Sequence, residues 1–224
     1  MLQIADDLSI LDGRPRYGIN VYLVGDVLID AGTRYAADRI LRQMKDLPLA
    51  AHAVTHAHPD HQGASHRVCA EFDIPLLCGD GDADAMESGD FASLAPVNPV
   101  TRWQMRFWVG PAHPVARRLK EGDVVGGFTV LETPGHSPGS VCFWRDSDRV
   151  LIVGDVLFGQ SEITGRPGLH EPPRGFTLDP GRNRESIRRL AALNPATVCF
   201  GHGPVLDNRD NDLARFADTL KDDL

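Results

Sequence analysis

The sequence THAHPDHQG at residues 55–63 places three histidines and an aspartate within six residues, directly after a short apolar run. Because alternate side chains of a strand face the same side, His56 and His58 can both hold one metal ion. The proline that follows keeps the backbone extended and cannot continue a strand ladder, so a turn into a helix is expected. On that turn, Asp60 and His61 can face a second ion beside the first. The stretch therefore predicts a metal site at the end of a strand.

Three further residues of ligand type stand at the ends of later apolar runs. His136 ends the sequence TPGH, Asp155 follows Val-Gly, and His202 lies between two glycines. The neighbouring glycines and proline allow the backbone to turn sharply at these points. Imidazoles and carboxylates gathered at one end of a sheet suit a borderline divalent ion such as Zn²⁺. Two adjacent ions need a shared ligand, and the carboxylate of Asp155 has two oxygens to offer.

Each of these residues also has a purely structural explanation when it is taken alone. Asp60 could cap the following helix, and Asp155 could be an ordinary turn residue. A single buried histidine such as His202 is more often a hydrogen-bonded core residue than a ligand. Seven ligand-type residues at strand ends, four of them in the pattern HxHxDH, favour a metal centre over separate structural roles.

The composition is that of an ordinary globular chain and disfavours several classes of function. The 224 residues are 42% hydrophobic and 24% charged, which fits one domain over 1–224. A net charge of −8 disfavours binding to the phosphates of nucleic acids. No apolar run reaches roughly 18 residues, and residues 1–13 are acidic where an export signal is basic, so we expect no membrane span and a cytoplasmic location. The four cysteines are far apart, and we expect reduced thiols.

The hydrophobic pattern predicts an α/β architecture with mixed sheets and helices on the outside. Residues 19–29 predict a hairpin with a Gly-Asp turn, and residues 36–47 show the apolar spacing of a helix. Residues 79–114 are rich in Gly and Asp and then in aromatics, which predicts an irregular insertion with one or two short helices. Residues 159–180 are predicted to be a loop. Further strands are expected at 74–78, 128–132, 140–144, 150–153 and 198–200, and helices at 184–193 and 212–224.

The order of these motifs resembles that of the metallo-β-lactamase superfamily over about residues 17–205. The stretch at 55–63 matches the signature motif of that family. The later motifs match at residues 133–136, 154–155 and 201–203. The resemblance implies an αββα sandwich of two mixed β-sheets flanked by helices, with a dinuclear metal site along one edge.

The resemblance also implies a ligand set and a cofactor. The first metal would be held by His56, His58 and His136. The second would be held by Asp60, His61 and His202, with Asp155 bridging the two. Asp30 fits an early acidic motif of the family and would contact a ligand from outside the metal site. The implied cofactor is two Zn²⁺ per chain, with iron, manganese or a mixed pair as alternatives.

Such a centre points to hydrolysis of a small molecule. Zinc lowers the pKa of bound water to about 7, so a metal-bridging hydroxide would be available to attack a carbonyl. A metal would also stabilise the developing oxyanion. Asp60 is the candidate catalytic residue, because it could bind metal and also orient the nucleophile or accept its proton. We therefore expect a dinuclear metal-dependent hydrolase that acts on a small-molecule ester, thioester or lactone.

Other activities of the superfamily stay open as alternatives. Persulfide dioxygenases resemble the same pattern but hold a single iron through fewer ligands. β-Lactam hydrolysis is disfavoured because zinc β-lactamases commonly carry cysteine where this chain has Asp155 and usually carry export signals. Glutathione thioesters fit less well because glyoxalase II has a helical extension, whereas this chain ends soon after His202. Lactonases often place a tyrosine near the substrate in the later half, where this chain has none. A binding protein on an inactive hydrolase fold is disfavoured because no motif ligand is missing.

Two groups of residues outside the motifs have open roles. Trp103, Phe107 and Trp108 form an aromatic stripe that we expect in the core or at a homodimer contact, with a substrate lid as the alternative. The 159–180 loop contains three polar residues for which surface positions are expected, with binding of a substrate carboxylate as the alternative for the arginines. These residues are Arg166, His170 and Arg174.

Overall fold

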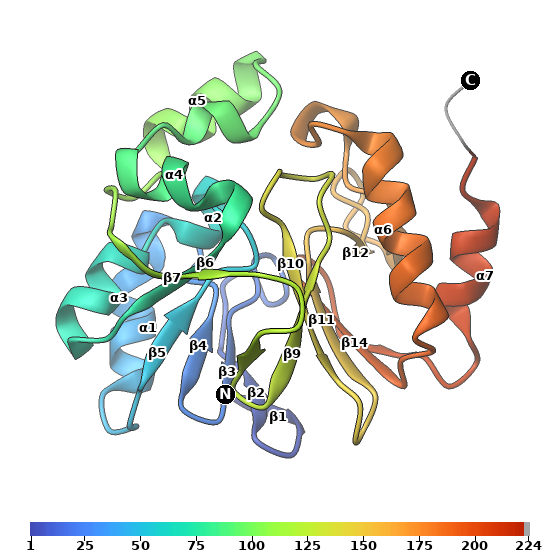
Figure 1. Ribbon diagram of the computed structural model, residues 1–224, viewed down its shortest axis with the longest axis horizontal. Helices are drawn as coiled ribbons and strands as arrows, with labels where there is room; N and C mark the ends of the chain where they lie inside the picture. Colours follow the sequence, from blue (N-terminus) through green and yellow to red (C-terminus); the bar gives the residue numbers. More distant parts are fainter. Residues whose placement is uncertain (222–224) are drawn as a thin grey trace.

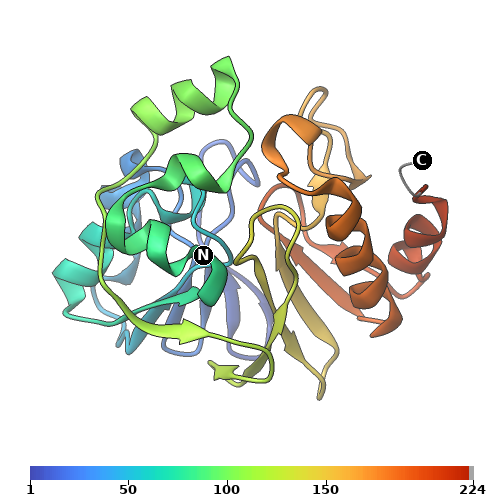
Figure 2. The same cartoon turned by 45° about the horizontal axis from the view of Figure 1, so that its top comes forward.

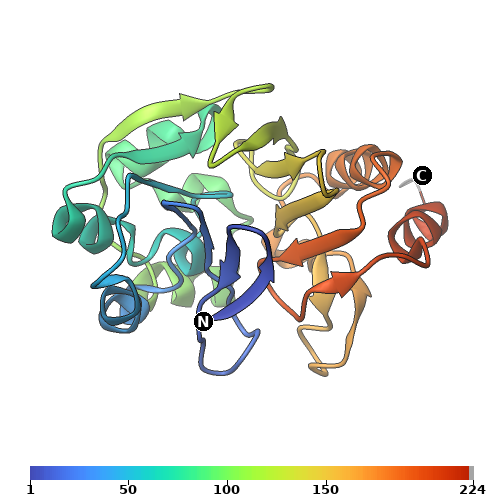
Figure 3. The ribbon, with the colours of Figure 1, turned by 90° about the horizontal axis from the view of Figure 1, so that it is seen from below.

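Two β-sheets lie face to face in the computed structural model, which describes residues 1–221, and helices cover their outer faces (Figure 1). The first sheet has the strand order β1-β2-β3-β4-β5-β6-β7, and the second has the order β15-β14-β11-β10-β9-β8. Seen from below in Figure 3, α1 and α3 lie outside one sheet, and α6 and α7 lie outside the other. The expected αββα sandwich of two mixed sheets is confirmed.

The first sheet uses the N-terminal half of the chain in sequence order. Its strands are β1 (Leu2–Ala5), β2 (Leu8–Ile10), β3 (Tyr22–Val24), β4 (Val27–Ile29), β5 (Ala51–Ala53), β6 (Leu76–Gly79) and β7 (Val115–Leu119). Strands β1 to β4 are antiparallel neighbours, whereas β4 to β7 are parallel. Parallel neighbours need a crossover connection, which α1 (Ala37–Met44) and α3 (Ser65–Phe72) supply. The predicted hairpin at 19–29 and the predicted helix at 36–47 are both present.

The second sheet uses the C-terminal half. Its strands are β8 (Val124–Val125), β9 (Phe128–Glu132), β10 (Val141–Arg145), β11 (Val150–Gly154), β14 (Thr197–Phe200) and β15 (Leu206–Asp207). Strand β11 pairs in parallel with β14, and α6 (Pro180–Ala192) makes the crossover between them. Helix α7 (Asp212–Thr219) packs beside α6. The last three residues of the helix predicted at 212–224 lie outside the described residues.

Both faces of the central strands are buried, which explains their nearly continuous apolar sequence. Phe143 of β10 faces the other sheet, where it packs in one core with Tyr22 and Phe128. Its neighbours Cys142 and Trp144 face the opposite side and pack under α6. All four cysteines are free and buried, as expected.

Two segments differ from the predicted pattern. Residues 79–114 are mainly helical, with α4 (Asp80–Ser88), a 3₁₀ helix η2 (Phe91–Leu94) and α5 (Pro99–Phe107). This segment makes the crossover between the parallel strands β6 and β7, and α4 packs against both of them. The prediction of a loop over 159–180 is wrong in part, because β12 (Phe158–Gln160) and β13 (Pro167–His170) form a hairpin there, followed by the 3₁₀ helix η3 (Arg174–Phe176).

The loops that follow β4, β5, β9, β11 and β14 meet at the edge of the sandwich that faces the viewer in Figure 2. Helix α5 overhangs this edge from one side, and the segment between β12 and α6 overhangs it from the other (Figure 2). Within residues 1–221 no helix is both long and apolar enough to cross a membrane.

Candidate metal centre

The loops at this edge bring all seven predicted ligand residues together. The first cluster consists of His56, His58 and His136, and the second consists of Asp60, His61, Asp155 and His202. Within each cluster the possible ligand atoms lie within 4.8 Å of one another, and every one of the seven residues is buried. The sequence therefore identified residues that the fold gathers from four separate loops.

Local structure explains how the HxHxDH motif divides between the clusters. His58 has extended backbone angles and immediately precedes the short helix α2 (Pro59–Gln62), which begins at the proline. The helix turns Asp60 and His61 toward the second cluster while His56 and His58 stay in the first. The turn that the proline predicts is therefore present.

Glycines beside the later ligands permit close packing. A Cβ atom on Gly201, next to His202, would lie only 2.0 Å from Asp155 Oδ1. Gly135, next to His136, has a φ of +140° and lies against the backbone of Asn183, where a Cβ would meet the nitrogen at 2.3 Å. A side chain at either position would push the loops that carry the ligands apart, so the close approach of these loops requires glycine at both positions.

The first cluster consists of closely packed imidazole rings and has no carboxylate of its own. Its imidazole rings contact one another, with centroid distances of 4.6 Å for His56–His58, 4.8 Å for His56–His136 and 4.5 Å for His58–His136. Burial and the neighbouring histidines lower the pKa of His56 well below its ordinary value. Burial likewise lowers the pKa of His136 to about 3. Neutral imidazole is the form that binds a metal ion.

The second cluster pairs imidazoles with carboxylates. Asp155 lies 3.3 Å from His61 Nε2 and 3.2 Å from His202 Nε2, and Asp60 lies 3.3 Å from His202 Nε2. Burial opposes a charged imidazole, but the charge of Asp155 outweighs it and raises the pKa of His61 and His202 well above the ordinary value. Burial also opposes a charged Asp60, yet the hydrogen bond from His202 lowers the pKa of that carboxyl to about 2.

Asp155 reaches both clusters. Besides its contacts in the second cluster, its Oδ2 lies 3.7 Å from His136 Nε2 and 4.0 Å from His56 Nε2. No other residue among the seven forms ion-pair contacts with histidines of both clusters in the described part of the chain. This position is the one that a shared ligand requires.

Metal ions fit the donor atoms that face the centre of the site. Each of the five histidines uses its outer nitrogen for a protein partner, which fixes the orientation of the ring. The partners are the Thr55 hydroxyl for His56, the Leu94 carbonyl for His58, Asp30 for His61, the Thr177 hydroxyl for His136 and the Gly18 carbonyl for His202. Four atoms that face inward are buried without a hydrogen bond, namely Nε2 of His56, His61 and His136 and Oδ1 of Asp155. Buried polar atoms without a partner are costly, and coordination of a divalent ion would satisfy them.

Two further carboxylates hold the ligand loops in place. Asp30 accepts hydrogen bonds from the Thr55 backbone nitrogen at 2.7 Å and from His61 Nδ1 at 2.9 Å, which agrees with the contact that the resemblance implies. Asp82 of α4 accepts hydrogen bonds from the backbone nitrogens of Ala57 at 2.9 Å and Gly139 at 2.6 Å. It therefore ties the His56–His58 segment to the loop that carries His136. Sequence reasoning missed Asp82, because nothing distinguishes it from the other aspartates of its Gly- and Asp-rich segment.

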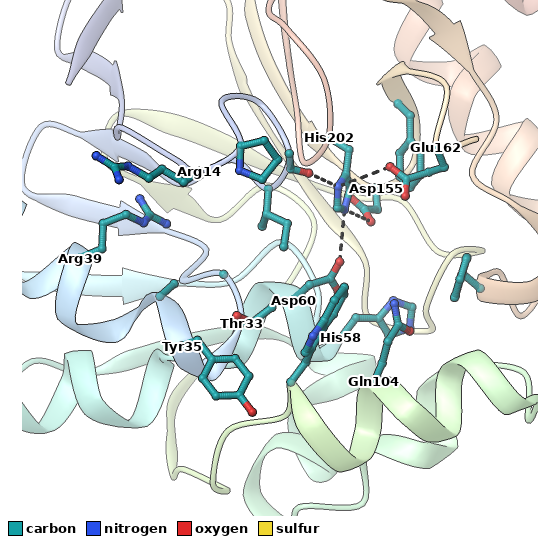
Figure 4. A pocket seen from close by; sticks show the side chains of 18 of the residues that line it. Arg14, Thr33, Tyr35, Arg39, His58, Asp60, Gln104, Asp155, Glu162 and His202 are labelled. Carbon is teal, nitrogen blue, oxygen red and sulfur yellow. Dashed lines mark hydrogen bonds and ion pairs between the residues drawn. The ribbon is translucent and has the colours of Figure 1, made fainter. Parts of the chain in front are cut away.

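A cavity of about 570 Å³ opens onto both clusters. In Figure 4 its metal end shows His202, Asp155 and Glu162, whereas Arg14 and Arg39 lie together at the other end. The remaining walls come mainly from the loop before β3, the start of α1, helix α5 and the segment after β11. They include Pro15, Ile19, Thr33, Tyr35, Gln104, Trp108, Phe158 and Phe176.

The aromatic residues of α5 and the polar residues of the 159–180 segment, whose roles the sequence left open, lie partly at the cavity and partly at the surface. The expectation of a core position is wrong for Trp103 and Phe107, whose side chains are 48% and 38% exposed. These two rings pack on each other along the outer side of α5, whereas Trp108 lines the cavity. The three polar residues of the 159–180 segment do not line this cavity. They are Arg166, His170 and Arg174.

Comparison with known proteins gives a consistent picture. The chain is 30% identical over 87% of its length to the probable metallo-hydrolase YflN of Bacillus subtilis, of which it covers 82%. It is 30% identical over 78% of its length to a hydroxyacylglutathione hydrolase of Bdellovibrio bacteriovorus and covers 56% of that protein. Among solved structures, TTHA1623 in a di-iron-bound form is 33% identical, with a TM-score of 0.65, and the match covers 88% of this chain and 92% of that one.

The family assignment follows from the same residues that form the site. The model of the metallo-beta-lactamase superfamily matches residues 14–202, a range that includes all seven clustered residues as well as Asp30 and Asp82. The Bacillus subtilis relative YflN, of which the chain covers 82%, carries the name of a probable metallo-hydrolase. The chain therefore belongs to the metallo-β-lactamase superfamily and is a metal-dependent hydrolase of that family, as its motifs predict.

Proposed function

We propose that the protein is a dinuclear hydrolase that cleaves a small-molecule ester, thioester or lactone. The observation that carries this proposal is the pair of ligand clusters that share Asp155 at one end of a single cavity. An enzyme with one metal would need only one of the clusters, yet each cluster has two inward-facing atoms that are buried without a hydrogen-bond partner in the described part of the chain. The substrate would enter the cavity and present its scissile carbonyl to the metal end.

Each ligand has a distinct role in the proposed site. The first ion would be held by His56, His58 and His136. The second would be held by Asp60, His61 and His202, and Asp155 would bridge the pair. When bound, such a pair supplies a hydroxide at neutral pH and stabilises negative charge on the substrate oxygen. We propose zinc because imidazole and carboxylate donors suit it, with iron and manganese as the other candidates.

Asp60 is the proposed catalytic residue of the chain itself. It lines the cavity, and its low pKa keeps it ionised over the whole neutral range. The His202 imidazole at 3.3 Å fixes the position of the carboxylate. An ionised carboxylate at the cavity wall can accept a hydrogen bond from the attacking group and orient it, a role that its pKa of about 2 favours over proton acceptance.

The cavity limits the size of the substrate. Its volume of about 570 Å³ lies within the range of small-molecule sites. The relative named as a hydroxyacylglutathione hydrolase supports a thioester, although this chain covers only 56% of that protein. The Phe158 ring packs on His202 with a centroid distance of 4.8 Å, and Trp108 and Phe176 also line the cavity, which suits an apolar acyl or ring portion of the substrate.

The decisive experiment combines metal analysis with a substrate panel. We expect about two transition-metal ions per purified chain by mass spectrometry, and hydrolysis of at least one ester, thioester or lactone that is abolished by a chelator and restored by zinc. β-Lactams belong in the panel as a comparison. A content near one iron per chain, with oxygen consumption in the presence of glutathione persulfide, would instead identify a dioxygenase.

Several features of this proposal rest on the sequence alone. They are the single-domain organisation with an insertion near 79–114, a cytoplasmic location, the absence of a nucleic-acid partner and a possible homodimer. Sedimentation of the purified chain tests the homodimer, and cell fractionation tests the location.

A further inference from the structure

The end of the cavity away from the metal ligands carries two arginines. Arg14 belongs to the loop between β2 and β3, and Arg39 belongs to α1, so tertiary structure alone brings them together (Figure 4). The acidic residues among the described lining of the cavity are Asp60, Asp155 and Glu162, and Figure 4 places all three away from the arginines. In a chain with a net charge of −8, this end of the cavity is locally cationic.

The guanidinium of Arg39 is held in place by backbone and not by a carboxylate. It donates a hydrogen bond to the carbonyl oxygen of Asp12, and Gln43 binds the same backbone unit through its side-chain amide. The carboxylate of Asp12 is engaged by the amino group of Met1 at 2.9 Å. Arg39 is half-buried, and its burial lowers the pKa of the guanidinium despite the nearby charge of Asp12. The fixed group therefore carries a charge that is only partly compensated.

Arg14 supplies a second cation without a protein partner. Among residues 1–221 its exposed side chain has no hydrogen-bond or ion-pair partner. It extends over the same end of the cavity as Arg39 in Figure 4. Two guanidinium groups that converge on a cavity match the planar, bidentate geometry of a carboxylate or phosphate.

We infer that Arg14 and Arg39 form an anion subsite that binds a carboxylate or phosphate of the substrate at a position remote from the scissile bond. The inference rests on the proposed function, and it names the substrate class as an ester, thioester or lactone with an anionic group at its far end. Anchoring that group would orient the carbonyl at the metal end, so binding energy far from the reacting atoms would assist the reaction.

Matched substrates test the subsite through the specificity of the enzyme. Mono-p-nitrophenyl esters of dicarboxylic acids from succinate to suberate are compared with neutral p-nitrophenyl alkanoates of equal chain length, using metal-loaded protein. The specificity ratio is kcat/KM for the anionic ester divided by kcat/KM for the neutral ester of the same chain length. At the chain length where this ratio is largest in the parent protein, Arg14→Gln and Arg39→Gln should each lower it by about tenfold. That is the size expected for the loss of a charge-assisted hydrogen bond. Arg42→Gln removes the same charge from the same helix outside the cavity, and should leave the ratio unchanged.

Direct binding separates this inference from the proposed function. Calorimetry on the metal-loaded protein compares glutarate and 3-phosphonopropanoate with butyrate, which has only one anionic end. We expect the probes with two anionic ends to bind more tightly, and the advantage to shrink about tenfold in either arginine variant. The better of the two probes identifies the anion as carboxylate or phosphonate. If no ester is hydrolysed, the proposed function fails while the binding advantage still decides the subsite.

One further variant, together with Arg14→Gln, excludes misfolding as the explanation of a lowered ratio. Arg39→Gln removes the hydrogen bond to the Asp12 carbonyl, which helps to hold the loop, whereas Arg14→Gln removes no hydrogen bond or ion pair among residues 1–221. Arg39→Lys keeps the charge and should recover part of the ratio. An unchanged ratio and an unchanged binding advantage in Arg14→Gln, with the same thermal unfolding as the parent protein, would overturn the inference.

Discussion

The two ligand clusters lie side by side but are built on opposite electrostatic principles. The first cluster has three buried histidines and no carboxylate, and burial keeps His56 and His136 neutral. The second cluster has two histidines and two carboxylates, and the charge of Asp155 raises the pKa of its histidines. Asp60 would contact the second ion alone, whereas Asp155 would be shared by both ions, so the second ion would be the more fully neutralised.

This difference bears on metal choice and on the way each cluster is held. Neutral imidazoles suit zinc, whereas carboxylates also accept harder ions such as manganese, so a mixed pair would place the harder ion in the second cluster. Two supporting carboxylates hold the clusters in different ways, and Asp30 also accepts a hydrogen bond from the Thr55 hydroxyl that contacts His56 of the first cluster. Asp82 binds the backbone that carries the first cluster, and Asp30 binds His61 of the second directly. The four predictions that follow test this contrast.

The largest effect is expected from removing the group that joins the clusters. Asp155→Ala should lower kcat/KM more than about a thousandfold, because loss of a single preorganised catalytic donor already costs about 10²–10³. The metal content should fall as well, since both clusters lose a contact. Steady-state kinetics and mass spectrometry measure the two effects. Full activity in a folded Asp155→Ala protein would show that the clusters work independently.

A histidine outside both clusters tests whether burial alone can keep an imidazole neutral. Burial lowers the pKa of His52 to about 4, against the opposing effects of the Leu28 carbonyl and Asp30. In the unfolded chain the pKa returns to about 6.5, so between pH 6.5 and 4 the unfolded state binds a proton that the folded state does not. The free energy of unfolding should therefore fall by about 3 kcal/mol from this residue as the pH drops through that window.

Urea denaturation of the parent protein and His52→Gln at several pH values measures this contribution. The variant should lose the part of the pH dependence that His52 causes, so that the two curves converge toward pH 4. The hydrogen bonds to the Leu28 carbonyl and Ser65 hydroxyl contribute a difference that does not depend on pH. Parallel curves across the whole range would mean that burial is not the dominant cause.

The supporting carboxylates should affect different metals. Asp30→Asn should weaken metal binding by about 10–100-fold in the second cluster, whose His61 it binds directly, and less in the first, which it reaches only through Thr55. Asp82→Asn should instead weaken the first cluster, since it loosens the loops around Ala57 and Gly139. Cobalt spectra of the two variants can be compared with those of His202→Ala and His136→Ala, which each remove a ligand from one cluster. Loss of the same cobalt band in both variants would contradict the division.

The smallest effect is expected at the cavity wall. Trp108→Ala should raise KM a few-fold, roughly the loss of one partly buried aromatic contact, and leave the metal content intact. Phe107→Ala is the matched control, because this side chain lies outside the cavity on α5 and contacts the ring of Trp103 but not that of Trp108. Equal effects of the two substitutions on KM would show that both act through the stability of α5.

The ligands were predictable because metal chemistry leaves a local signature. The spacing of HxHxDH follows from the two-residue period of a strand and the turn at the proline, and the glycines beside His136 and His202 mark sharp turns. Amphipathic spacing likewise predicted α1 and α6. The hairpin of β12 and β13 was missed because glycine and proline dominate its sequence, although Phe158 is buried there.

The cavity and the supports of the site were decided by tertiary structure. Asp82, Arg14 and Arg39 are ordinary charged residues in sequence, and only packing places one under the ligand loops and the other two at the cavity end. Which ligands share a cluster also depends on how the two sheets face each other. A metal centre requires particular residue types at a fixed local spacing, and that spacing can be read from the sequence. A cavity wall is assembled from segments that are distant in sequence, so its residues can be identified only once the chain has folded.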